Sequence, residues 1–476
     1  MKRTLKNFAA QCDSRLESAD TSFGDATFNE VVIDSRQVTA GDLFAALPGE
    51  HADGHEYVAA AAQAGAAGAI VSKRVAAALP QIVVTDVAQA LSRAGSAWRA
   101  AFRGPVIGVA GSNGKTTTKE MLSAILAQRG ECLSTRGNLN NHLGVPLTLL
   151  RLRDTQLSAV IEIGANHAGE VAALVEIARP GIGVITNAGA EHLEGFGSLE
   201  GVARAEGEMV AGLDSAGVAI INADDDYAAL WRNMSRARVV SFGLHNADLQ
   251  ASDLRLDVGA QGFVTRFTLQ SAAGSVPVAL SLAGRHNVYN ALAAAAAAMA
   301  AGATLAQVAA GLGAMRSVAG RMQLKPLAGG AWLIDDSYNA NPSSARAALE
   351  VLAELQGRRW VVLGDMGELG VHAQSSHREL GTLARSLGVE RLYTFGSLAA
   401  LAAESFGAGA ERFTEIDPLL RAVSASLGEA RHHEVRLLVK GSRVNKLERL
   451  VTALAAAPTA PTAPTASAAP PHRKAV

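Results

Sequence analysis

The chain is a long, nearly neutral sequence of 476 residues, with 49% hydrophobic residues, 18% charged residues and a formal net charge of −1. That length exceeds one ordinary hydrophobic core, so several domains are expected. The charge balance provides no overall field that attracts nucleic acid or an anionic membrane, so neither is an expected partner. Cys12 and Cys132 are the only cysteines, too few for a disulfide framework, which predicts a cytoplasmic protein.

No segment has the character of a signal peptide or a membrane span. The first 15 residues carry charges and lack an apolar centre. The apolar run at residues 291–301 is too short to cross a bilayer and is almost all alanine. We expect it to form a packed helix of a soluble protein, with no membrane insertion.

Short β-rich runs alternate with longer helical stretches almost throughout, which is typical of parallel α/β sheets. Three domains are predicted, at residues 1–104, 105–318 and 319–456. The first is expected to end in a helix that reaches Phe102. Its expected strands lie at residues 31–33, 43–46, 69–71 and 82–84.

The second domain is predicted to be a parallel sheet that binds a nucleotide, with a smaller β-rich insertion at residues 249–282. Alternating apolar residues and a turn near residues 259–262 predict this insertion. The third domain has the alternation of a Rossmann-like fold, with strands expected at residues 332–334, 360–363, 392–395 and 435–439. The final residues, 457–476, repeat Pro-Thr-Ala and cannot form a core, so a disordered tail is expected.

The most informative segment is a strand at residues 106–110 that leads through a glycine turn into a helical pattern starting at Lys115. Glycines let successive backbone N–H groups face a phosphate, and the helix N-terminus adds the positive end of its dipole. Lys115 is expected to reach the β- and γ-phosphates of ATP, and the Thr116 hydroxyl is expected to bind Mg²⁺. The ATP-binding residues predicted in this loop are Gly111, Ser112, Asn113, Gly114, Lys115, Thr116 and Thr117.

Two other strand ends carry candidate metal ligands. Residues 158–162 form an apolar run that ends in Glu162. A buried carboxylate without a cation is costly and Mg²⁺ prefers oxygen ligands, so Glu162 is a candidate ligand. His192 follows a predicted strand at residues 182–187, where ligands of open α/β sheets bind. A lone histidine there is more often structural, so its assignment depends on the motifs around it.

Taken together, these motifs resemble those of the Mur ligase family, over about residues 31–447. The resemblance is carried by the phosphate loop at residues 111–117 and by two segments, Gly-Asn-Leu-Asn-Asn at 137–141 and Gly-Val-Pro-Leu-Thr-Leu-Leu at 144–150. Further similar segments lie at residues 34–36, 41–49, 53–55, 284–287, 320–322, 335–342, 364–366 and 440–443.

The resemblance implies an ATP-dependent amide-bond ligase of peptidoglycan precursor synthesis that acts as a monomer. The segments at 137–141 and 144–150 point to the branch that joins D-alanyl-D-alanine to UDP-N-acetylmuramoyl-tripeptide. The first domain is then expected to bind the UDP end of the substrate. The implied UDP-substrate contacts are Ser35, Arg36, Asn138 and Asn141, and the further ATP contacts are Asn287, Arg321 and Asp336. The implied catalytic residues are Lys115, Glu162, His192 and Glu206. The implied metal ligands are Thr116, Glu162 and His192.

The chemistry of such a ligation agrees with this set of residues. ATP phosphorylates the carboxylate, and the amine then attacks the acyl phosphate, which releases ADP and phosphate. Phosphoryl transfer depends mostly on positioning and charge neutralisation, so a lysine, backbone donors and Mg²⁺ are expected without a protein nucleophile. The reactive intermediate needs protection from water, so closure by the third domain is expected.

One position departs from the family pattern. Members of the family have a lysine there that carries a carbamate near the second metal, and this chain has Glu206. Glutamate supplies a permanent negative charge from a shorter stem, so either the helix sits closer to the metal or a metal-bound water fills the gap. We expect Glu206 to act at the metal rather than to be a solvated residue on the surface of its helix.

Two groups of alternatives remain. A sister ligase that adds a single amino acid, or a folylpolyglutamate synthetase, belongs to the same enzyme class, and the segments at 34–36 and 137–141 argue against both. A non-catalytic nucleotide-binding regulator belongs to another class. The sequence has no Asn-Lys-x-Asp guanine motif, which argues against a GTPase switch.

Overall fold

The computed structural model describes residues 3–12, 15–17, 25–49, 52–259, 262–316, 318–327, 330–429 and 435–456. The predicted tail at 457–476 and the tip of the predicted turn, residues 260–261, lie outside these residues. The chain forms two compact units. The first comprises Met1–Val318, Asn341–Ala347 and Glu368–Ala373, and the second comprises Ala319–Ala340, Ala348–Gly367 and Gln374–Val476.

The first unit begins with a five-stranded sheet in the order β1-β5-β4-β3-β2. Its strands are β1 (Arg15–Glu17), β2 (Val31–Val32), β3 (Leu43–Ala45), β4 (Gly68–Val71) and β5 (Gln81–Val83). Only β1 runs antiparallel to its neighbour, and it is the strand that the sequence pattern did not predict. The helices here are α1 (Leu5–Gln11), η2 (Ser35–Gln37), η3 (Gly54–Tyr57), α2 (Val58–Gln63) and α3 (Val87–Ala101).

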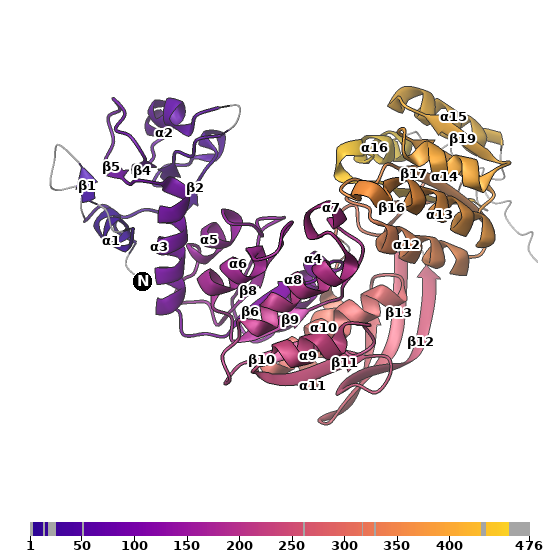
Figure 1. Ribbon diagram of the computed structural model, residues 1–476, viewed down its shortest axis with the longest axis horizontal. Helices are drawn as coiled ribbons and strands as arrows, with labels where there is room; N and C mark the ends of the chain where they lie inside the picture. The colour runs from indigo at the N-terminus through magenta and orange to yellow at the C-terminus, as the bar shows by residue number, and fades with distance from the viewer. Residues whose placement is uncertain are drawn as a thin grey trace, which may run out of the picture. The chain divides into compact units, whose positions relative to one another are not determined.

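A nine-stranded sheet forms the centre of the first unit, in the order β14-β13-β12-β11-β10-β9-β6-β8-β7 (Figure 1). Its strands are β6 (Val106–Ala110), β7 (Cys132–Ser134), β8 (Ser158–Glu162), β9 (Ile182–Ile185), β10 (Val218–Asn222), β11 (Arg238–Gly243), β12 (Leu249–Gly259), β13 (Gly262–Ser271) and β14 (Gly274–Leu280). All pairs from β7 to β12 are parallel. The predicted β-rich insertion is present, but β12 pairs with β11, so the insertion extends the central sheet and adds two antiparallel pairs.

Helices cover the central sheet and include the predicted alanine-rich one. They are α4 (Lys115–Leu126), α5 (Gly144–Leu149), α6 (Glu170–Ala178), α7 (Leu193–Phe196), α8 (Leu199–Ala211), α9 (Ala228–Met234), α10 (Arg285–Ala300) and α11 (Leu305–Ala314). In α10 the alanines from Ala291 to Ala298 are buried, which confirms a packed helix. Small side chains let this helix lie close to its neighbours, α4 among them. None of the described helices has the length and apolar character that crossing a bilayer requires.

One hydrophobic core runs from the five-stranded sheet into the central sheet. Helix α3 lies between them, and its Trp98 is 2% exposed and donates from Nε1 to the Leu152 carbonyl at 3.3 Å. At Gly95, a methyl group would lie 3.0 Å from Pro146 Cα, so α3 and α5 are in backbone contact. This shared core explains why the first two predicted domains fall in one compact unit. The domain boundaries at 104 and 318 remain predictions.

The second unit is a six-stranded sheet in the order β15-β16-β20-β17-β18-β19. Its strands are β15 (Gln323–Pro326), β16 (Trp332–Asp336), β17 (Arg358–Gly364), β18 (Arg391–Phe395), β19 (Ala410–Phe413) and β20 (Val435–Lys440). Only β15 is antiparallel to its neighbour, which agrees with the predicted Rossmann-like domain. The remaining helices in the described part of the chain are α12 (Pro342–Glu354), η5 (Gly370–His372), α13 (Ala373–Ser386), α14 (Ala399–Phe406), α15 (Ile416–Glu429), η7 (Arg443–Asn445) and α16 (Glu448–Ala456).

Helix α11 offers a test of the packing that supports α4. A methyl group at Gly311 would lie 2.4 Å from Ile125 Cα, whereas at Gly313 the nearest atom would be the Ala279 carbonyl oxygen at 3.9 Å. Gly311→Ala should therefore lower the free energy of unfolding by roughly 1–3 kcal/mol, through overpacking against α4. Gly313→Ala should leave it unchanged or raise it by up to about 1 kcal/mol, through helix propensity. Urea unfolding of both variants measures the difference, and equal values would contradict this packing.

Candidate active site

The predicted strand–turn–helix is present between β6 and α4. Gly111 and Gly114 have φ angles of 118° and 82°, which favour glycine. Both also lie too close to other chain segments to carry a side chain. A Cβ atom would lie 2.1 Å from Thr186 Oγ1 at Gly111 and 2.1 Å from Asn290 Oδ1 at Gly114. The two glycines thus let the loop pack between the end of β9 and helix α10.

The end of β9 holds the inner side of the loop. The Ser112 N–H donates to the Asn187 carbonyl at 2.9 Å, and the Asn113 N–H donates to Asn187 Oδ1 at 3.1 Å. The Thr186 hydroxyl donates to the Asn113 carbonyl at 2.7 Å. Helix α4 starts just after this loop, and the first turn of a helix has N–H groups without acceptors in the helix. With the helix dipole, this arrangement suits a phosphate.

Lys115 lies at the start of α4 and is 15% exposed. Its Nζ donates to the carbonyls of Gly111 at 2.6 Å and Ser112 at 3.1 Å, and it pairs with Glu191 Oε1 at 3.1 Å. Burial alone lowers the pKa of Lys115, but the negative charges of Glu191, Glu206 and Glu162 outweigh it and raise the pKa. The lysine is therefore charged at neutral pH. Glu191 was not predicted as a site residue, although it directly precedes His192.

Glu162 lies at the end of β8 and is 2% exposed. Its Oε1 accepts from the Thr116 hydroxyl at 3.2 Å and from Asn140 Nδ2 at 2.9 Å. Its Oε2 is buried and accepts no hydrogen bond from the described residues, and Lys119 Nζ lies 3.8 Å away from it. Asn140 belongs to the Gly-Asn-Leu-Asn-Asn segment, but the sequence did not predict its contact with Glu162.

His192 has a left-handed backbone, with φ of 48°, at the start of α7. Its Nδ1 lies 2.5 Å from Glu368 Oε2, and its side chain is 25% exposed. Of the three predicted metal ligands, Thr116 and Glu162 are thus in contact, while His192 pairs with Glu368. The described residues contain no group of three or more His, Cys, Asp or Glu side chains arranged to hold a metal ion.

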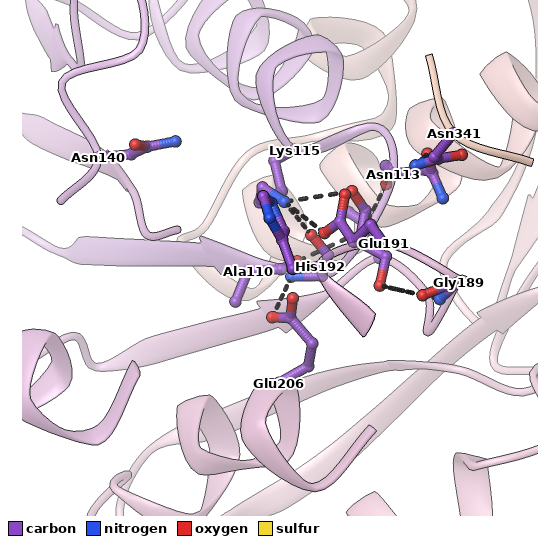
Figure 2. Close-up of polar contacts among 12 residues, drawn as sticks. Ala110, Asn113, Lys115, Asn140, Gly189, Glu191, His192, Glu206 and Asn341 are labelled. Atoms are coloured by element: carbon purple, nitrogen blue, oxygen red, sulfur yellow. Dashed lines mark hydrogen bonds and ion pairs between the residues drawn. The ribbon is translucent and has the colours of Figure 1, made fainter. Parts of the chain in front are cut away.

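Glu206 lies on the buried face of α8 and is 4% exposed. Its Oε2 accepts the N–H of Gly111 at 2.6 Å. Figure 2 shows this carboxyl group directed at the loop backbone beside Ala110. Burial raises the pKa of Glu206 to about 7, which the nearby Lys115 only partly offsets. A permanent charge was expected from the sequence, whereas the buried carboxyl is only partly ionised at neutral pH.

Two sets of asparagine contacts lie at the loop, one around Asn113 and one around Asn287. Asn113 Nδ2 donates to Ser343 Oγ at 3.0 Å, and Asn113 Oδ1 accepts from Asn341 Nδ2 at 2.8 Å, as Figure 2 shows for Asn341. Asn287, predicted to bind ATP, is 4% exposed at the start of α10. Its Oδ1 accepts from Asn290 Nδ2 at 3.1 Å, and Asn290 lies against Gly114. Asn287 therefore supports the loop through Asn290.

The predicted UDP-substrate residues have separate local partners. Arg36 is 87% exposed and pairs with Asp34 at 2.8 Å, and this pairing lowers the pKa of Asp34 to about 2. Ser35 begins η2, for which Asp34 is the N-cap. Asn141 Oδ1 accepts the N–H of Gly144 at 2.9 Å at the start of α5, and Asn138 is exposed.

Arg321 and Asp336, the other predicted ATP contacts, belong to the second unit. Asp336 Oδ2 accepts from Lys440 Nζ at 2.6 Å, and Asp336 Oδ1 accepts the Met322 N–H at 3.1 Å. The Arg321 guanidinium lies 4.5 Å from the centre of the Tyr338 ring. These residues gather near the carboxyl ends of β16 and β20, the edge where ligands bind in parallel sheets.

The buried Glu206 carboxyl predicts a pH-dependent stability. Its pKa lies above the ordinary 4.5, at about 7, so the native state holds more protons than the unfolded state between these values. The free energy of unfolding therefore falls as pH rises through this window, by up to about 3 kcal/mol. Glu206→Gln lacks the titrating group and should lose less stability over that range. Urea unfolding of both proteins at about pH 5 and pH 8 tests this shift, and a difference between them that does not change with pH would contradict it.

Three family models match the chain. "Mur ligase family, catalytic domain" matches residues 27–99, "Mur ligase middle domain" matches residues 109–298, and "Mur ligase, glutamate ligase domain" matches residues 320–443. The middle-domain match includes the phosphate loop, Glu162, His192 and Glu206.

Similar proteins cover almost the whole chain. It is 42% identical to UDP-N-acetylmuramoyl-tripeptide–D-alanyl-D-alanine ligase of Escherichia coli (strain K12), over 95% of this chain and 98% of that protein. It is 39% identical to the enzyme of that name from Mycobacterium bovis, over 82% of each chain. The crystal structure of MurF from Acinetobacter baumannii superimposes with a TM-score of 0.87 and 35% identity, over 95% of this chain and 98% of that one. The chain belongs to the Mur ligase family.

Proposed function

We propose that this chain uses ATP to join D-alanyl-D-alanine to UDP-N-acetylmuramoyl-tripeptide, with release of ADP and phosphate, in peptidoglycan precursor synthesis. The observation that carries the proposal is the match to the E. coli ligase of this activity over 95% of the chain. The charged phosphate loop supports it independently, because it provides what ATP-dependent acyl activation needs. The proposed compartment is the cytoplasm, and the proposed active species is a monomer.

The proposed role of Lys115 is to neutralise charge on the transferred phosphoryl group. Its Nζ is now bound to the carbonyls of Gly111 and Ser112, next to the N-terminus of α4. A phosphate oxygen can replace the more distant Ser112 carbonyl while the contact with Gly111 remains. The substrate carboxylate then attacks the γ-phosphate, and the dipeptide amine attacks the acyl phosphate, so no protein nucleophile is needed.

The donor set fits Mg²⁺, which supplies charge neutralisation and orientation for the phosphates when bound. Glu162 Oε2 is a buried carboxylate oxygen without a hydrogen-bond donor among the described residues, and the Thr116 hydroxyl contacts the same carboxylate. His192 has Glu368 at Nδ1, the arrangement of a metal-ligating histidine that is oriented by a carboxylate. We therefore assign Thr116, Glu162 and His192 as the residues that hold Mg²⁺.

The remaining roles rest on the resemblance of these residues to the family motifs. Ser35, Arg36, Asn138 and Asn141 are the proposed contacts of the UDP substrate, and Asn287, Arg321 and Asp336 are those of ATP. The dipeptide is assigned to the carboxyl ends of the strands in the second unit, near Lys440 and Arg443. This edge carries the cationic side chains of Lys440 and Arg443, and a cation suits a peptide carboxylate.

Lys115→Ala tests the phosphate-loop role. It removes a fixed cation from the transferring phosphoryl group and leaves the loop backbone in place, so kcat should fall by at least about two orders of magnitude. Lys6→Ala, which removes an exposed lysine on α1, is the control and should turn over normally. ADP release with both substrates present measures the two rates. Near-normal turnover by Lys115→Ala would contradict the assignment.

The acceptor tests the proposed reaction itself. A site built for a dipeptide recognises a peptide unit together with a free carboxylate, and it discriminates strongly against ligands that leave its polar groups unpaired. D-alanyl-D-alanine should therefore stimulate ADP release far more than D-alanine, and only when the UDP-linked tripeptide is present. Equal stimulation by a single amino acid would indicate a sister ligase. ATP hydrolysis that responds to no acceptor would indicate a regulator.

A further inference from the structure

Glu206 is a buried acid whose contact is with the backbone of the phosphate loop. Its neighbours on the same face of α8 include Val202, Ala205 and Met209, all at most 1% exposed. A carboxyl group in such surroundings costs free energy unless a hydrogen bond satisfies it. The Gly111 N–H supplies that bond at 2.6 Å, a short distance for an N–H to carboxyl contact.

We propose that Glu206 is a positioning residue whose carboxyl oxygen fixes the Gly111 peptide and, through it, the place of Lys115. The proposal deepens the function proposed above and rests on it for its consequence in turnover. It differs from the metal role that the sequence favours, because here the hydrogen-bond acceptor is essential and the charge is secondary.

The contacts form a continuous path from α8 to the catalytic lysine. Glu206 binds the N–H of Gly111, and the carbonyl of the same glycine accepts from Lys115 Nζ at 2.6 Å. Glycine has the least restricted backbone, and Gly111 has a φ of 118°. Thr186 holds the Ala110 carbonyl of this peptide group, and Glu206 holds its N–H. The next two N–H groups of the loop are held by Asn187. Glu206 completes this set at the first position.

The ionisation of Glu206 agrees with a role that does not need charge. Burial raises the pKa of this carboxyl to about 7, so both forms exist near neutral pH. A carboxylate and a protonated carboxyl both offer an oxygen acceptor to the Gly111 N–H. A metal ligand, in contrast, has to be the anion to be effective. What persists in both forms is the hydrogen bond.

Three substitutions separate the hydrogen bond from the charge and from the volume. Glu206→Gln keeps an oxygen acceptor at the same distance along the side chain and removes the charge. Glu206→Met keeps the length and removes the acceptor. Glu206→Asp keeps the charge and withdraws it by one methylene group. Thermal unfolding first establishes that each variant is folded. Glu206→Gln changes the shape of the side chain least, so it still decides between the two roles if Glu206→Met does not fold.

Calorimetric titration with ADP, with and without MgCl₂, is the direct test because it does not depend on turnover. Glu206→Gln should bind ADP within about threefold of the parent, and Glu206→Met should bind about tenfold more weakly, since the Gly111 N–H is then buried without a partner. The enhancement of ADP binding by MgCl₂ should be the same in the parent and in both variants. Amide hydrogen exchange at the loop should be faster in Glu206→Met only.

Other results of these titrations would contradict the positioning role of Glu206. If Glu206→Gln loses ADP affinity as much as Glu206→Met, or if either variant raises the MgCl₂ concentration needed, the charge acts on the metal and the positioning role is overturned. If Glu206→Asp alone keeps wild-type behaviour, the charge again decides. The acceptor assay on the parent protein is separate: a parent without dipeptide-dependent turnover contradicts the proposed reaction, while the ADP titrations still decide the role of Glu206.

Discussion

The interaction of the Lys115 ammonium with the acidic side chains around it is the one on which the rest of the site depends. Lys115 is largely removed from water, and desolvation alone disfavours its charge. Glu191, Glu206 and Glu162 restore it by surrounding the ammonium with negative charge from three different elements. Glu162 ends β8, Glu206 lies on α8, and Glu191 lies in the loop between β9 and α7, so the charge of one side chain requires these three segments to meet at one point.

The central sheet provides this meeting point. Strand β6 lies between β8 and β9, and all three run parallel, so their carboxyl ends reach the same edge. β6 delivers the glycine loop, β8 delivers Glu162, and β9 delivers Thr186 and Asn187. Two glycines with no space for a side chain let these segments touch. The close packing of α4 against α10 and α11 then fixes the helix that follows the glycine loop.

Features set by local pattern could be predicted from the sequence. A strong pattern of apolar residues or a distinctive composition marks each of these features. Examples are the buried strands β6 and β8, the helix that starts at Lys115 and the alanine-rich helix α10. Strands such as β15 and β19 were missed because they are short and polar edge strands. The β-rich insertion was foreseen, but its pairing with β11 is a long-range contact that no local pattern contains.

The same distinction applies to the site. Lys115 and Glu162 follow from their places at the start of a helix and the end of a strand. Glu191, Asn140 and Asn187 were missed because ordinary loop residues acquire a role only when the fold brings them to the lysine or to Glu162. Glu206 was found by comparison with the family motif, yet its partner is a backbone N–H, which carries no sequence signal.

The charge balance around the loop predicts that a nucleotide binds better with a divalent cation than without one. Lys115 already faces three carboxyl groups, two of them 4% exposed or less, so a triphosphate adds negative charge where the acids outnumber the lysine. In the proposed complex, a divalent cation at Glu162 and Thr116 would offset the added negative charge, and protonation of Glu206 would lower the repulsion further. A neutral Glu206 still holds the Gly111 N–H. With the proposed role of Glu206, the loop would keep its shape while the charge beside it adjusts to the nucleotide, which a fixed anion at this position could not do.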